Sequence, residues 1–352
     1  MEKGNKSSEN TTKGSTPSFF QLANSLLANL PQRSQEIVKK RFGLVDGRIE
    51  TLEKIGQDYD ITRERVRQII VDAIKKISEY SDMEAFREAE EKIIFAISQR
   101  DGIINEEKLI EDLGFDHPSE VNSVIFFAVC SNKIIEIEEK GSLKKSRALS
   151  NDILIKVTDT AEAAKHVLTA AGVPMTDDEI AHEIGKKKSE LSRGEILNFL
   201  SILSNISKNK FGKWGFSNWM EINPKGTRER IYLVLKEHKK SLHFTEIAKI
   251  IDKLGISKRK SHPQTVHNEL IKDDRFVLIG RGTYALREWG YSPGAIKDVL
   301  EKILEKSGRH MSKDEILEEV AKLRKVKKTT VMINLNNNAK FEKHGEKYAW
   351  KA

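Results

Sequence analysis

Residues Thr51 to Ile70 read T-L-E-K-I-G-Q-D-Y-D-I-T-R-E-R-V-R-Q-I-I, and this stretch predicts two short helices joined by a tight turn. Apolar residues recur at helical spacing on one face of each half: Leu52, Ile55 and Tyr59, then Val66, Ile69 and Ile70. Thr62 stands where its hydroxyl can cap the second helix, and Asp60 tolerates the left-handed backbone of a turn. Gly56 leaves room for the first helix to approach the second. This order of elements is typical of a helix-turn-helix, whose second helix enters a DNA major groove.

The outward side chains of the second helix form a dense hydrogen-bonding surface. They are Arg63, Glu64, Arg65, Arg67 and Gln68. Taken alone, such a charge run could be a solvated helix face, because charge runs are usually surface. The preceding helix and the turn favour contact with DNA instead.

Leu30 to Ile77 also resembles a known family, the region-four domain of the primary sigma factors of bacterial RNA polymerase. Three runs carry the resemblance, in the family's order and spacing: L-P-Q-R-S-Q-E-I-V-K-K-R-F-G-L (Leu30 to Leu44), T-L-E-K-I-G (Thr51 to Gly56) and T-R-E-R-V-R-Q-I (Thr62 to Ile69). One departure is Ile70, where the family commonly carries an acidic residue. We find no aromatic-rich, basic helix of the kind with which a sigma factor melts promoter DNA, so the resemblance implies the promoter-reading part alone.

The resemblance implies roles for individual residues. In that family the second helix reads the upstream promoter hexamer, and the residues that match its base-reading positions are Arg63, Glu64 and Gln68. Their chemistry agrees, because Arg can pair bidentately with guanine, Gln with adenine, and Glu can accept from cytosine. Thr62, Arg65 and Arg67 fall nearer the DNA phosphates.

The composition fits a nucleic-acid partner and several small modules. The chain has 352 residues, of which 38% are hydrophobic and 32% charged, with a formal net charge of +8. A positive charge of this size supports a polyanionic partner without proving one. The apolar runs are too short to cross a bilayer, and the lone cysteine, Cys130, is most simply a buried small hydrophobe. We therefore expect a cytoplasmic, nucleoid-associated protein.

Beyond the helix-turn-helix, a helix start recurs at nearly constant spacing. It appears as M-T-D-D-E-I (Met175 to Ile180), L-H-F-T-E-I (Leu242 to Ile247) and M-S-K-D-E-I (Met311 to Ile316). Thr176 with Glu179, and Ser312 with Glu315, make capping boxes that begin helices. Each copy ends on an aromatic-bearing, strand-like run, and two β-prone stretches around a Gly-X-Gly turn predict a hairpin. Three helices followed by a hairpin predict a winged helix, so the repeat indicates tandem modules.

The expected fold class is mainly α, with an N-terminal helix-turn-helix followed by tandem winged-helix modules that carry small β-hairpin wings. We expect a disordered tail at residues 1–18, the sigma-like domain at 19–81, a possible degenerate winged helix at 82–150, and winged helices at 157–221, 227–291 and 292–352. Aromatic residues at the hairpin ends, such as Trp214, Trp289 and Trp350, are expected mostly to fill the seam between wing and helices.

Thr227 to Tyr291 resembles a second family, the HARE-type winged helix found at the front of the delta subunit of bacterial RNA polymerase. The resemblance is carried by L-H-F-T-E-I-A (Leu242 to Ala248), H-P-Q-T-V-H-N-E-L (His262 to Leu270) and D-R-F-V-L-I-G-R-G-T-Y-A-L-R-E-W-G (Asp274 to Gly290). It implies a nucleic-acid or chromatin-linked setting, but a winged helix can also bind proteins.

A basic cluster lies just before the third helix of each clear copy. In the HARE-type copy it is Lys258, Arg259 and Lys260. Two roles stay open for it: contact with DNA phosphates beside a second reading helix, or a solvated loop. Arg281, at the tip of the wing, is a further candidate for DNA contact.

These patterns lead to two hypotheses about function. In the first, the chain is a sequence-specific transcription regulator that reads promoter-like double-stranded DNA through Arg63, Glu64 and Gln68 and is associated with RNA polymerase. In the second, it is an adaptor that docks on the polymerase or on a regulator without reading DNA sequence. The sequence has no phosphate-binding loop, no nucleophile elbow and no zinc-finger spacing. We therefore expect no enzyme activity, cofactor, metal or small-molecule substrate.

Overall fold

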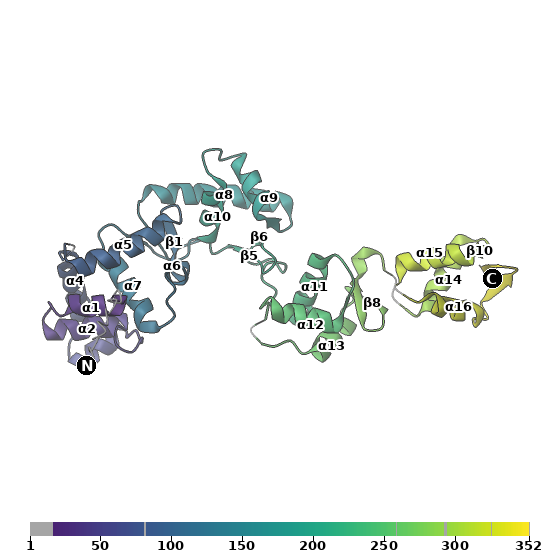
Figure 1. The fold of residues 1–352 in the computed structure, drawn as a ribbon, viewed down its shortest axis with the longest axis horizontal. Helices are drawn as coiled ribbons and strands as arrows, with labels where there is room; N and C mark the ends of the chain where they lie inside the picture. The colour runs from purple at the N-terminus through teal and green to yellow at the C-terminus, as the bar shows by residue number, and fades with distance from the viewer. Residues whose placement is uncertain (1–16, 81, 258, 292–293, 325, 352) are drawn as a thin grey trace, which may run out of the picture. The chain divides into compact units, whose positions relative to one another are not determined.

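The computed structural model describes residues 17–80, 82–257, 259–291, 294–324 and 326–351. It is mainly helical, with sixteen α-helices and four small three-stranded sheets in this described part (Figure 1). The expected fold class is confirmed. The chain forms two compact units, one of Met1–Ala171 with Asp178–Ile206 and the other of Gly172–Asp177 with Ser207–Ala352. Of the tail expected at 1–18, residues 1–16 lie outside the described residues.

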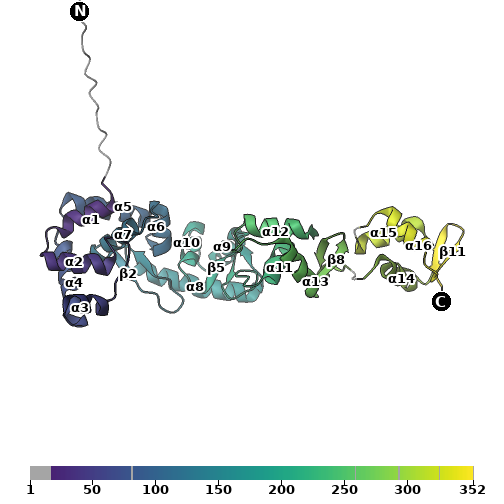
Figure 2. The ribbon, with the colours of Figure 1, turned by 90° about the horizontal axis from the view of Figure 1, so that it is seen from below.

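The first unit begins with four helices: α1 (Phe19–Leu27), α2 (Gln32–Phe42), α3 (Leu52–Tyr59) and α4 (Arg63–Ser78). Figure 2 labels α2, α3 and α4 close to one another, and each of the three contacts the other two. They share a small core in which Ile37, Ile55, Val66 and Ile70 are buried. This core joins one face of each helix, as the helical spacing of the apolar residues predicted.

The same unit continues with α5 (Glu84–Ser98), β1 (Ile103–Asn105), α6 (Glu106–Leu113), α7 (Pro118–Cys130), β2 (Ile135–Ile137) and β3 (Ser146–Ala148). Its larger core runs from α1 to α7 without a break at residue 82. Phe42 of α2 meets Phe126 of α7 edge-on with ring centroids 5.2 Å apart, and Phe19 of α1 meets Phe127 at 5.9 Å. The helix-turn-helix is therefore packed onto α7 rather than set apart from it, and Cys130 is buried in this core as expected.

The order helix, short strand, two helices, two strands occurs four times. After the copy that begins with α5, the second consists of α8 (Asp152–Ala171), β4 (Met175–Thr176), α9 (Asp177–Gly185), α10 (Arg193–Ser201), β5 (Ile206–Lys208) and β6 (Lys213–Phe216). The third consists of α11 (Thr227–His238), β7 (Leu242–His243), α12 (Phe244–Lys253), α13 (Pro263–Lys272), β8 (Phe276–Gly280) and β9 (Thr283–Leu286). The fourth consists of α14 (Ile296–Ser307), β10 (Met311–Ser312), α15 (Lys313–Leu323), α16 (Lys328–Asn336), β11 (Phe341–His344) and β12 (Lys347–Trp350). This arrangement is that of winged-helix-like modules; where each module begins and ends stays a prediction.

Each sheet has one strand more than the predicted hairpin. In all four, the last strand lies between the other two. The extra strand precedes the second helix and is very short, as in β7, where Leu242 pairs with Tyr284 and His243 with Thr283. A strand of two residues is too short to show the alternation of apolar and polar residues, so the sequence did not predict it.

The aromatic residues at the hairpin ends differ in burial. Trp214 and Tyr284 are buried, as expected. Trp289 is half-buried against the core of the third copy. Trp350 is an exception, because it is 38% exposed at the end of the central strand β12. No helix among the described residues combines the length and the apolar content needed to cross a membrane.

Candidate nucleic-acid interface

The turn between α3 and α4 fixes where the second helix begins. Asp60 ends α3 in the left-handed conformation, with φ 51° and ψ 50°, and its amide donates to the carbonyl of Gly56. Thr62 then caps α4, since its hydroxyl accepts from the amide of Arg65 at 3.1 Å. Both features were expected from the residue types. The residues of the first turn of α4 are exposed.

Gly56 is required by the backbone of this turn. A Cβ added there would lie 2.7 Å from the carbonyl oxygen of Ile61, closer than real Cβ atoms come to another atom. The sequence predicted that Gly56 allows a close approach between the two helices. In the structure, the backbone that comes close to Gly56 is the turn at Ile61, immediately before α4 begins.

All six residues expected on the DNA side of α4 are exposed. They are Thr62, Arg63, Glu64, Arg65, Arg67 and Gln68. Between them Val66 is fully buried, and Ile70 is 7% exposed in the small core. Ile70 therefore serves packing, which accounts for an apolar side chain where the sigma family commonly has an acidic one.

Four of these side chains hold one another in place. Arg67 forms a bidentate pair with Glu64, with Nε and Nη2 donating to the two carboxylate oxygens at 2.9 and 2.7 Å. This hydrogen bond from Arg67 is the main reason why the pKa of Glu64 lies below its usual value. Arg65 donates to the amide oxygen of Gln68 at 3.2 Å. Glu64 is thus ionised and oriented, as an acceptor for a base amino group must be, but half of its hydrogen-bonding capacity is taken by Arg67.

Arg63 differs from its neighbours on α4. In the described part of the chain its guanidinium has no hydrogen bond or ion pair. It borders a shallow depression together with Arg41, Thr51, Leu52 and Glu53, at the joint start of α3 and α4. Its five donors are therefore all available, which suits the bidentate contact with guanine expected of it.

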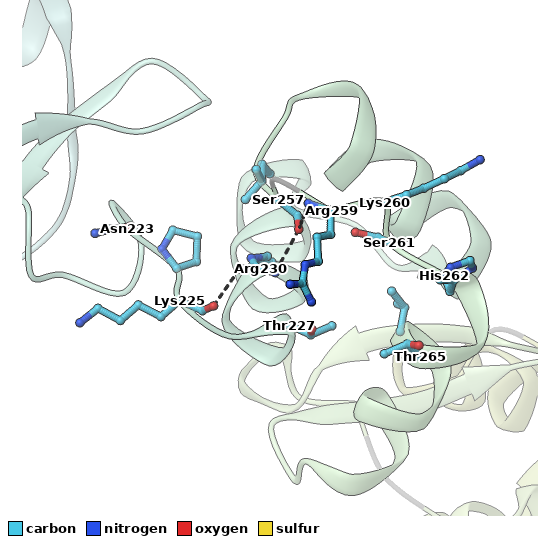
Figure 3. Close-up of a pocket in the computed structure, with 13 residues that line it drawn as sticks. Asn223, Lys225, Thr227, Arg230, Ser257, Arg259, Lys260, Ser261, His262 and Thr265 are labelled. Atoms are coloured by element: carbon cyan, nitrogen blue, oxygen red, sulfur yellow. Dashed lines mark hydrogen bonds between the residues drawn. The ribbon is translucent and has the colours of Figure 1, made fainter. Parts of the chain in front are cut away.

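A second candidate surface is a pocket in the copy that begins with α11 (Figure 3). Two segments line it, one leading into α11 and one leading into α13, and among its described lining residues there is no carboxylate. The side chain of Arg259 points into the pocket toward Thr227 and Thr265, whereas Lys225 and Lys260 extend away from it (Figure 3). Lys258 lies outside the described residues.

Arg230 is the fixed cation of this pocket. Its two terminal nitrogens donate to the carbonyl of Lys225 at 2.8 Å and to the hydroxyl of Ser257 at 3.3 Å. Its Nε is buried and has no partner among the described atoms. The sequence pattern did not single out Arg230, because a lone arginine inside a helix gives no signal until the loop before α13 is folded against it.

The start of α13 faces the same pocket. His262 stands at the cap position without accepting a hydrogen bond there, Pro263 follows it, and the first turn has no acidic residue. Exposed amides at a helix start favour an anion. Together with Arg230 and Arg259, they make this pocket suitable for a phosphate group.

The remaining basic candidates differ in their exposure and in whether their side chains are already paired. Arg281 is exposed at the turn of the β8–β9 hairpin. In the second copy, Lys186 pairs with Glu183 and Lys188 with Asp159, each at 2.6 Å. In the fourth, Arg324 is only 9% exposed and donates to the carbonyl of Leu278. The basic cluster is therefore not equivalent in the three copies: in the α11 copy Arg259 and Lys260 are exposed and have no ion pair within the described part of the chain.

One group of possible metal ligands was missed by the sequence analysis. His310, Glu342 and His344 bring one ligand atom each to within 4.8 Å of one another. His310 lies just before β10 and the other two residues lie on β11, far along the chain, so only the alternation of Glu342 and His344 could have pointed to this group.

Two family models match separate parts of the chain. Residues 26–79 match "Sigma-70, region 4". Residues 227–289 match the HARE-HTH domain, a helix-turn-helix domain whose description names ASXL and restriction endonuclease proteins. Both expected resemblances are confirmed over these two segments.

The similar curated proteins match over the first of these segments. The "RNA polymerase sigma factor SigA1" of Synechococcus elongatus is 46% identical over 52 residues, which are 15% of this chain and 13% of that protein. The "RNA polymerase sigma factor SigA" of Clostridium acetobutylicum is 44% identical over 52 residues, or 15% of this chain and 14% of that protein. The chain thus spans about a seventh of the length of these relatives, and the similarity to them lies over the region-four segment.

Proposed function

We propose that the chain is a sequence-specific transcription regulator that reads promoter-like double-stranded DNA with α4 and acts together with bacterial RNA polymerase. The observation that carries this proposal is the match to sigma region four over a segment whose second helix, α4, is capped by Thr62 and carries exposed polar side chains. In this proposal Arg63, Glu64 and Gln68 contact base edges, while Thr62, Arg65 and Arg67 lie along the phosphates.

The network on α4 suggests how these contacts divide. Arg63 has no partner within the described residues and is the best placed to bind a guanine edge. Glu64 and Arg67 approach DNA as a pair, so Glu64 would neutralise part of the charge that draws Arg67 to a phosphate. The start of α4, where the helix dipole is positive, favours a phosphate as well.

The pocket beside α13 supports additional contact with a DNA phosphate. Arg259 and the start of α13 supply the attraction, and Lys258, Lys260 and Arg281 would extend the contact along the duplex. Such contacts raise affinity and its salt dependence without adding sequence preference.

The direct test is the affinity of the full chain for a duplex with an upstream promoter hexamer, compared with a shuffled duplex. Arg63→Ala should weaken binding to the preferred duplex by about 1–3 kcal/mol and leave the shuffled duplex almost unaffected. Arg87→Ala is the matched control, because Arg87 is an exposed arginine on α5. Equal affinity of wild type and Arg63→Ala for the preferred duplex would contradict the proposal.

Two exposed ion pairs support an alternative function, that of a protein adaptor. The exposed pairs of Glu64 with Arg67 and of Lys186 with Glu183 reduce the charge available for DNA. In this alternative the chain is an adaptor that docks on polymerase or on a regulator without reading DNA sequence. The salt dependence of binding distinguishes the two proposals. Affinity for DNA that depends on contacts with several phosphates falls steeply as the salt concentration rises, whereas affinity for a protein partner through an apolar interface changes little.

A further inference from the structure

The outer face of the last sheet carries two histidines and a glutamate in one group. His310 immediately precedes β10, and Glu342 and His344 lie on β11. The imidazole rings of His310 and His344 are 4.6 Å apart and nearly perpendicular. The ligand atoms of all three residues lie within 4.8 Å of one another.

Strand register explains why these residues meet. Glu342 pairs with Ala349 and His344 with Lys347, while Met311 pairs with Tyr348. Tyr348 and Met311 are buried toward the helices, so residues that alternate with them point outward, because neighbours along a strand face opposite sides. Extending the β10 register by one residue places His310 beside Ala349, on the same outer face as Glu342.

A small residue in the central strand lets the side chains close over the sheet. β12 lies between β10 and β11, and strands are about 4.8 Å apart, so the two outer strands are separated by roughly 10 Å. Side chains from both outer strands can meet only if the residue between them is short. That residue is Ala349, which is 8% exposed.

We propose that His310, Glu342 and His344 bind a divalent first-row transition-metal ion, with Zn²⁺ as the probe of choice. Two imidazoles and one carboxylate form a ligand set that suits zinc and its neighbours, whereas magnesium and calcium prefer oxygen ligands alone. His310 and His344 are exposed, so an ion has an open path to the site, as a binding site requires.

The bound ion would join the start of β10 to β11. The Nε2 of His344 lies 3.3 Å from a carboxylate oxygen of Glu342. Metal binding replaces this pair with bonds that also include His310. Since the ion binds the folded sheet and not the unfolded chain, it stabilises the copy that begins with α14.

The test is titration of the full-length, untagged, chelator-treated chain with ZnCl₂ by calorimetry, together with thermal unfolding. We expect one equivalent of Zn²⁺ to bind and the unfolding temperature of the last copy to rise. His310→Ala and His344→Ala should each weaken binding by about tenfold or more, since changes to supporting residues alone cost that much. Glu342→Gln should weaken it as well.

His182→Ala is the matched control, because His182 is an exposed histidine on α9. Its Zn²⁺ affinity should equal that of wild type. Folding of each variant is checked by its circular dichroism and by its unfolding temperature without metal. The proposal is overturned if the His310 and His344 variants, folded normally, bind Zn²⁺ as tightly as wild type, or if binding is lost in His182→Ala instead.

Discussion

At the scale of single residues, the turn of the helix-turn-helix depends on three residues with separate tasks. Gly56 admits the carbonyl of Ile61, Asp60 adopts the left-handed conformation, and Thr62 caps α4. Each task follows from residue type and position in the sequence. This explains why the geometry of the turn could be predicted from twenty residues.

Thr62 combines a structural and a proposed functional task that substitutions can separate. Thr62→Ala removes the acceptor for the Arg65 amide, so the free energy of unfolding of the first unit should fall by about 1 kcal/mol in denaturant titration. Thr62→Asp keeps a capping oxygen and should retain stability, but its negative charge should weaken DNA binding. If Thr62→Asp bound DNA as well as wild type, the proposed phosphate contact near Thr62 would be wrong.

Gly56→Ala should destabilise the first unit by about 1–3 kcal/mol, because the added Cβ cannot be accommodated next to the Ile61 carbonyl without backbone movement. Gly194→Ala is the control. Gly194 is also helical, and the nearest atom to its added Cβ is a serine oxygen at 3.8 Å. There the substitution should be neutral or stabilising, since Ala has the higher helix propensity. Equal effects at both positions, measured by urea unfolding, would show that Gly56 is not under steric constraint.

At the scale of elements, the repeated helix starts show how local sequence sets each copy. Ser312 caps α15 by accepting from the amide of Glu315, and the Glu315 carboxylate accepts from the amide of Ser312 at 2.7 Å. Arg309 adds an ion pair at 2.8 Å. The guanidinium of Arg309 and the hydrogen bonds from Ser312 lower the pKa of Glu315 to about 2.

The lowered pKa of Glu315 predicts how its contribution to stability changes with pH. A carboxyl whose pKa is lower in the folded state stabilises that state above its unfolded pKa, and the contribution is lost as pH falls through the folded value. For Glu315 the window runs from about 4.5 down to about 2. Side-chain NMR should show Glu315 titrating near the lower limit, and Arg309→Ala should raise that midpoint. Glu318→Gln, on the exposed side of the same helix, should leave it unchanged.

The elements also show where prediction from sequence ends. Helix starts, the hairpin at Gly282 and the apolar faces of α3 and α4 were predictable, because they depend on residues close in sequence. The short strands β4, β7 and β10 were not, since they form only by pairing with a strand many residues away. The same applies to Arg147, which is fully buried and pairs with Glu106 and Glu136.

The proposed sites also differ in whether the sequence could predict them. The exposure of Arg63 and Gln68 could be expected from the helical period of their own segment. The pocket around Arg230 and the group of His310, Glu342 and His344 require segments separated by about thirty residues to meet, as long-range contacts do. Trp350 is an exception among the aromatic residues at the hairpin ends, since it lies at the end of β12 and is 38% exposed.

At the scale of the whole molecule, we assign sequence preference to the first unit and general affinity to the pocket of the α11 copy. The double variant Arg259→Ala, Lys260→Ala should therefore bind every duplex more weakly. The slope of log affinity against log salt should fall by about 1 for each phosphate that the variant no longer neutralises. Lys253→Ala, an exposed lysine on α12, is the control. A change of preferred sequence in the double variant would contradict this division.

The most direct test of the central claim is selection of the purified full-length chain against a random duplex library, in parallel with Arg63→Ala. We predict enrichment of a motif like the upstream promoter hexamer by the wild-type chain and loss of its preferred base in the variant. Failure of the wild-type chain to enrich any motif, or the same motif enriched by Arg63→Ala, would contradict base reading by α4.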